Sequence, residues 1–96
     1  MTWIETHDGT IVNLERVEAI GVNHNKEKGK YNVILTVCDE SYYIFDICET
    51  RDEAGFCLEA IPEAICKSEK TVISYQDVMK IISRYGDTYY DEEKQL

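Results

Sequence analysis

Residues 31–48, with the sequence YNVILTVCDESYYIFDIC, carry the strongest β-structure signal in the chain. Both halves of this stretch are rich in valine, isoleucine, tyrosine and phenylalanine, which strands favour. The polar pair Asp39-Glu40 separates the halves and predicts a turn between strands at residues 31–38 and 41–48. Because each strand has apolar side chains on both faces, we expect this hairpin to lie at the centre of a sheet.

The residues before this hairpin predict further strands. Asp8-Gly9 is a strong signal for a tight turn, because both residues tolerate positive φ, and it predicts a hairpin over residues 3–13. Residues 14–17 are expected to form a turn or a short helical step. Residues 18–22 predict a short strand that Gly21 weakens, and the polar residues 24–30 predict an exposed loop.

An amphipathic helix is predicted directly after the hairpin. Thr50 and Glu53 form a capping box, which starts a helix by satisfying its first free amides. Pro62 removes an internal hydrogen bond and predicts either a kink or a restart of the helix. The apolar positions recur at helical spacing: Ala54, Cys57, Leu58, Ile61 and Ile65.

A second helix is predicted over residues 75–85, after a short extended piece at 71–73. Ser74 and Asp77 resemble a weaker cap, and Gly86 is placed to end the helix. The apolar face of this helix is broad, which is compatible with a homodimer. It consists of Val78, Ile81, Ile82 and Tyr85, with Met79 at its edge.

These signals predict one α+β domain over residues 1–86. Its expected architecture is an antiparallel sheet of four to five strands followed by two amphipathic helices, with the first helix packed on the sheet. Residues 87–96 are predicted to form an acidic, tyrosine-containing C-terminal tail.

The charge of the chain restricts its partners. The formal net charge of −9 over 96 residues opposes contact with a phosphate backbone, so direct nucleic-acid binding is not expected. The longest apolar stretches are a few residues long, so no membrane association is expected. With no signal-peptide pattern at Met1, a cytoplasmic location is predicted.

No catalytic, cofactor-binding or metal-binding motif is recognisable. The four cysteines lack a C-x-x-C pair, so we expect most of them to be buried as small hydrophobic residues, with Cys66 exposed. His7 and His24 have no ligand partner at helical spacing and are interpreted as surface histidines. The chain is therefore predicted not to be an enzyme and to need no cofactor.

The predicted function is that of a small acidic interaction domain that binds a protein partner with a basic surface, as an accessory protein of bacteria or phages. The candidate partner-binding residues combine carboxylates with aromatic side chains, which dominate interface energetics. They lie on the first helix and in the tail: Asp52, Phe56, Glu59, Glu63, Tyr89, Tyr90, Asp91, Glu92 and Glu93.

Two other functions remain open from the sequence. The net charge also fits an inhibitor that mimics nucleic acid and occupies the groove of a nucleic-acid-binding protein. Alternatively, the chain could be a small enzyme whose site lies at a subunit interface and uses Cys66 or a histidine.

Overall fold

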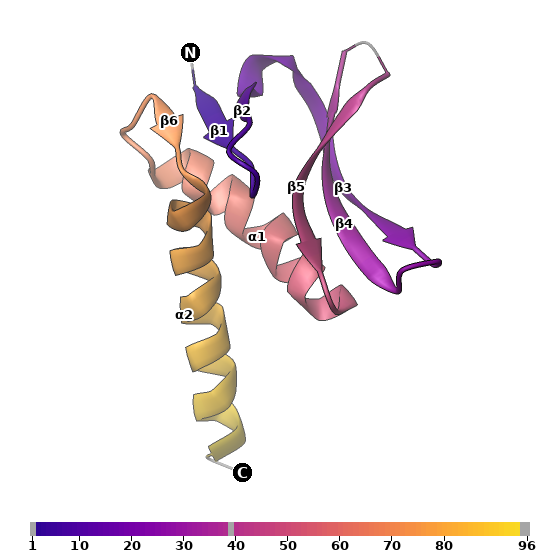
Figure 1. Cartoon of the computed structure of the whole chain (residues 1–96). Coiled ribbons are helices and arrows are strands. Elements are labelled where there is room, and N and C mark those ends of the chain that lie inside the picture. The colour runs from indigo at the N-terminus through magenta and orange to yellow at the C-terminus, as the bar shows by residue number, and fades with distance from the viewer. Residues whose placement is uncertain (1, 39, 95–96) are drawn as a thin grey trace.

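The structure is a computed structural model that describes residues 2–38 and 40–94, except for the side chains of residues 86–94. It contains two helices and two three-stranded sheets (Figure 1). In chain order the elements are β1 (Trp3–Glu5), β2 (Ile11–Asn13), the 3-10 helix η1 (Leu14–Arg16), β3 (Val17–Asn25), β4 (Lys30–Val37), β5 (Tyr42–Cys48), α1 (Arg51–Lys67), β6 (Val72–Ile73) and α2 (Tyr75–Lys94).

The strands form two sheets, so the prediction of one sheet of four to five strands is wrong. The smaller sheet has the order β2-β1-β6, and the larger has the order β3-β4-β5. The hairpin around Gly9 forms as predicted, but its strand β1 then pairs in parallel with β6, which lies beyond α1. β3 pairs with β4 and with no strand of the smaller sheet, so it belongs to a separate sheet. The His7 amide donates to the Phe45 carbonyl at 2.8 Å and links the two sheets.

The larger sheet contains the predicted hairpin, but only β4 is central. β4 pairs antiparallel with both β3 and β5, whereas β5 is an edge strand. β3 continues to Asn25, so the exposed connection is shorter than residues 24–30. His24 lies within β3 and stacks on Tyr31 of β4 with 4.3 Å between the ring centroids. A longer strand forms because this cross-strand ring pair extends the ladder.

Helix α1 runs unbroken through Pro62, packed on the larger sheet and on α2. Its first amides are capped as predicted, with the Glu53 amide donating to Thr50 Oγ1 at 3.2 Å. The buried side is rotated from the predicted one: Ala60 and Ala64 are buried, whereas Ile65 is exposed. Because α1 packs on both the larger sheet and α2, its buried side differs from the stripe that periodicity alone predicts.

Helix α2 extends to Lys94, so the prediction that Gly86 ends it is wrong. Glycine in a helix interior costs only about 1 kcal/mol relative to alanine. Residues 95–96 lie outside the described part of the chain.

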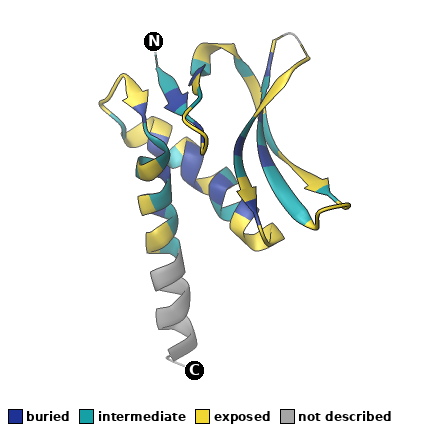
Figure 2. Ribbon diagram, in the orientation of Figure 1, coloured by how far each residue is buried: buried dark blue, intermediate teal, exposed yellow. Residues whose placement is uncertain are grey.

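One cluster of buried side chains joins both sheets and both helices (Figure 2). Its largest fully buried hydrophobic members are Phe45, Ile4, Leu35, Ile61, Ile73, Val33 and Val78. Within the described residues, neither helix is long and apolar enough to cross a membrane.

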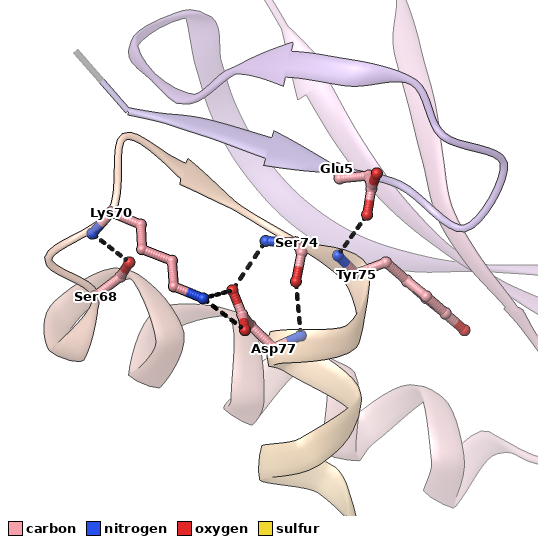
Figure 3. Close-up of polar contacts among 6 residues, drawn as sticks. All are labelled: Glu5, Ser68, Lys70, Ser74, Tyr75 and Asp77. Carbon is pink, nitrogen blue, oxygen red and sulfur yellow. Dashed lines mark hydrogen bonds and ion pairs between the residues drawn. The ribbon is translucent and has the colours of Figure 1, made fainter.

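The start of α2 is fixed by a network of hydrogen bonds (Figure 3). The Asp77 amide donates to Ser74 Oγ, and the Ser74 amide donates to Asp77 Oδ2, both at 3.1 Å, which is the predicted capping box. Lys70 Nζ lies 3.2 Å from Asp77 Oδ1. The Tyr75 amide donates to Glu5 Oε1 of β1 at 3.0 Å. The anion-attracting end of α2 is therefore occupied by carboxylates of the chain itself.

Replacing Asp77 with alanine is expected to lower the free energy of unfolding by about 1 kcal/mol at neutral pH. The hydrogen bond from the Ser74 amide holds the pKa of Asp77 below its ordinary value of 3.8, and Lys70 adds to this. A lowered folded-state pKa stabilises the fold above the ordinary value, and this contribution is lost as the pH falls through the folded-state pKa. The difference between variant and wild type should therefore shrink in acid denaturation titrations. Glu69→Ala, in the exposed connection before β6, is the control and should have little effect.

Candidate functional site

Strand β3 forms an open edge of the larger sheet. It pairs with β4 on one side, and among residues 2–38 and 40–94 no strand pairs with its other side. In an antiparallel edge strand, alternate residues point their N–H and C=O groups away from the neighbouring strand. β3 is nine residues long, and each of its residues is either exposed or half-buried (Figure 2). It can therefore accept a further strand over most of its length.

An apolar groove of about 400 Å³ lies beside the start of β3. One wall comes from η1 and β3, and Ile65 of α1 supplies the other. Ile65 is 38% exposed, although it belongs to the apolar series of the helix. Five apolar residues and the acidic Glu18 line the groove. The apolar ones are Leu14, Val17, Ala19, Ile20 and Ile65. We call this groove, together with the open edge of β3, the β3 edge site.

An open strand edge beside an apolar groove is the arrangement that binds extended peptides. The backbone of an added strand hydrogen-bonds to the edge, and alternate side chains of the peptide enter the groove. The β-bulge between Val17 and Ala19 increases the local twist at one end of the edge. Because the groove lies at this end, we expect a partner strand to start beside Ala19 and Ile20 and to continue along the regular part of β3.

The sequence did not identify this site, although part of its signal was present. Ile65 was assigned to the buried face of α1, so no exposed groove was expected. Gly21 was interpreted as a weakness in a short strand, whereas β3 runs through it. The edge position of β3 depends on which strands pair across the whole chain, and no local pattern shows this.

The predicted partner-binding residues of α1 divide into two groups. Asp52 and Glu59 are exposed, as expected for a solvated helix face. Glu63 is half-buried and accepts hydrogen bonds from Lys67 Nζ at 3.1 Å and from the Tyr85 hydroxyl at 3.2 Å. The hydrogen bond from Lys67 holds the pKa of the Glu63 carboxyl below its ordinary value.

Phe56 is half-buried and faces Tyr85 of α2, with 6.2 Å between the ring centroids. The ring therefore contributes to the junction of the two helices, which matches the alternative that it meets the C-terminal segment. The remaining candidates are Tyr89, Tyr90, Asp91, Glu92 and Glu93. Their backbone belongs to α2, and their side chains lie outside the described part of the structure.

Two of the four cysteines are buried, whereas most of them were predicted to be. Cys48 and Cys57 are buried, whereas Cys38 and Cys66 are exposed, the latter as expected. Cys38 lies beside the turn of the β4–β5 hairpin, where its Sγ donates to the Arg16 carbonyl at 3.3 Å. The end of a strand is poorly covered, so a cysteine there remains accessible.

The two buried cysteines lie close to Asp46. Each sulfur is 4.0 Å from Asp46 Oδ2, and the three potential ligand atoms all lie within 4.8 Å of one another. Asp46 and Cys48 belong to β5 and were predicted to share a face, and Cys57 comes from the second turn of α1. Sequence reasoning missed the group because Cys57 reaches the other two only through the packing of α1 on β5.

Burial dominates the electrostatics of this group. It raises the pKa of the Cys48 thiol to about 11, and the Asp46 carboxylate adds to the shift. Burial also raises the pKa of Cys57, with further contributions from Cys48 and Asp46. The pKa of Tyr75 is raised by burial and by its proximity and hydrogen bonding to Asp46. Without a further ligand, both thiols are therefore protonated at neutral pH and are poor nucleophiles.

No family model, no curated protein and no solved structure matches the chain. Any functional argument therefore depends on the geometry and chemistry of the sites described above.

Proposed function

We propose that this chain is a non-enzymatic interaction domain that binds an extended segment of a protein partner at the β3 edge site. The observation that supports this proposal is the combination of an unpaired nine-residue strand edge with an apolar groove beside the first residues of that strand. Isolated edges are usually blocked by charges, proline or a covering element. β3 contains no proline and a single acidic residue, Glu18.

The charge of the chain favours a partner segment that carries lysine or arginine. Glu18 lies in the groove itself, and Asp52 and Glu59 add negative charge on the exposed side of α1. With a net charge of −9, the long-range field steers basic segments toward the molecule and repels acidic ones. Two copies of the chain would bring equal negative charges together, so the proposed occupant is a different protein.

Selection from a library of random displayed peptides is the direct probe of this site. The selected sequences are expected to alternate apolar residues with polar or basic ones, because every second side chain of an added strand faces the groove. Binding should weaken as the salt concentration rises, since part of the attraction is between exposed charges. Peptides without such alternation would argue against strand addition.

Ile65→Ser is expected to weaken the binding of a selected peptide by roughly tenfold or more, the loss typical of a central apolar interface residue. The matched control is Ile47→Ser on β5, because Ile47 is 48% exposed but does not line the groove. The control should change affinity less than about twofold. Isothermal titration calorimetry of both variants provides the comparison. Equal losses from both, or none from Ile65→Ser, would place the binding surface elsewhere.

The mimicry of nucleic acid is the second candidate, and the net charge of −9 favours it. Several carboxylates are paired within the chain: Glu63 with Lys67, Asp77 with Lys70, and Glu49 with Lys30. These pairs reduce the local negative potential, which makes an extended array of phosphate-like charges harder to form. A partner that loses nucleic acid when this protein binds would favour mimicry, whereas a partner that retains it would favour strand addition.

A further inference from the structure

We propose that Asp46, Cys48 and Cys57 form a binding site for a zinc ion. The three side chains come from β5 and α1, and their potential ligand atoms lie within 4.8 Å of one another. This site is distinct from the β3 edge site, because none of its residues lines the apolar groove. The inference does not depend on the proposed peptide-binding function.

The distances fit a tetrahedral metal site after a small contraction. Zinc binds thiolate sulfur at about 2.3 Å and carboxylate oxygen at about 2.0–2.2 Å, which places sulfur and oxygen ligands about 3.5 Å apart. Both sulfurs are 4.0 Å from Asp46 Oδ2. Shortening these two sulfur–oxygen distances by about half an ångström, with the two sulfurs already within 4.8 Å of each other, would close the site around an ion.

The carboxylate of Asp46 is already oriented for this role. The Ile47 amide donates to its Oδ1 at 2.9 Å, which leaves Oδ2 directed at the two sulfurs. Outer hydrogen bonds of this kind fix the ligands of metal sites. One oxygen is thus held by the backbone while the other is available to an ion.

The group combines buried sulfur ligands with an accessible side. Cys48 is 5% exposed and Cys57 is 1% exposed, whereas Asp46 and Tyr75 are half-buried. An ion would enter past Asp46, and either a water molecule or the Tyr75 hydroxyl could complete four-coordination. Two thiolates with one oxygen ligand favour zinc over magnesium or calcium, which prefer oxygen ligands alone. Each thiol that becomes a ligand releases its proton to solvent, so binding of one ion releases up to two protons.

Titration of the full chain with Co²⁺ under reducing conditions tests this proposal. Co²⁺ serves as the spectroscopic probe, because thiolate ligation produces sulfur-to-cobalt charge-transfer absorption and a tetrahedral site produces intense visible bands. We expect saturation at one ion per chain and displacement of Co²⁺ by Zn²⁺. Absence of the charge-transfer absorption would overturn the proposal and leave the two thiols as packing residues.

The two exposed cysteines provide a matched control. The double variant Cys38→Ser/Cys66→Ser should keep the full Co²⁺ absorption spectrum. Cys57→Ala should weaken Co²⁺ binding more than about 100-fold, which exceeds the usual effect of losing a group that only hydrogen-bonds to a ligand. Asp46→Asn changes a half-buried side chain and is expected to keep the fold while weakening binding about tenfold or more. Circular dichroism establishes that each variant is folded. Loss of binding in the double variant, or full binding in both Cys57→Ala and Asp46→Asn, would overturn the site.

Discussion

Replacing Phe45 with alanine is expected to lower the free energy of unfolding by about 3–5 kcal/mol. Phe45 is fully buried on β5, and its ring lies 5.6 Å from that of Tyr75 at the start of α2. Its carbonyl also accepts the hydrogen bond from His7 that links the two sheets. A domain of this size is typically stable by about 5–15 kcal/mol, so this one side chain accounts for a large part of the total. Urea denaturation followed by circular dichroism measures the loss.

Phe56→Ala is the matched control, because the chain has two phenylalanines and Phe56 is the half-buried one. Its ring packs on one side against Tyr85. Removal of a partly covered ring should cost about 1–2 kcal/mol. Equal losses from the two variants would contradict the placement of Phe45 at the centre of the core.

The second large effect is expected at Ile61 of α1. Ile61 is fully buried, so Ile61→Ala should lower the free energy of unfolding by about 2–5 kcal/mol through lost burial and a residual cavity. Ile65→Ala, one turn later in the same helix, should cost less than about 1 kcal/mol, since Ile65 is 38% exposed and alanine favours helix. Guanidinium denaturation of both variants tests the orientation of α1 on each side of Pro62. A larger loss at Ile65 than at Ile61 would show that the helix is rotated from the described position.

Much of the fold could be predicted because its signals are local. The turn at Asp8-Gly9, the cap at Thr50 and the cap at Ser74 each depend on a few neighbouring residues, and all three form as expected. The β4–β5 hairpin follows from period-2 patterning within one stretch of chain. These elements do not depend on how the sheets are assembled.

The remaining features depend on contacts between distant segments. The parallel pairing of Ile4 with Ile73 joins residues far apart in the sequence, so no local pattern predicts it. Ile65 is 38% exposed although α1 packs on both the larger sheet and α2, and Ala60 and Ala64 are buried in its place. Helical periodicity identifies the apolar stripe of α1, but it does not show that Ile65 of that stripe lines the groove beside β3.

Both proposed sites were missed for the same reason. The groove needs β3 at a sheet edge beside Ile65, and the metal site needs α1 to bring Cys57 to Asp46. Neither arrangement has a short sequence signature, since the residues come from separate elements. The exposed acids Asp52 and Glu59 were identified from sequence because helical spacing places them opposite the apolar stripe of α1.

The measurement that tests the peptide-binding proposal most directly is residue-resolved amide hydrogen exchange of the protein with and without a selected peptide. Strand addition predicts that alternate amides of β3 exchange at least about tenfold more slowly in the complex, because the added strand satisfies them. Amides of β5, the other edge strand of the larger sheet, should be unchanged and serve as the internal control. Unchanged exchange along β3 at saturating peptide would contradict the proposal.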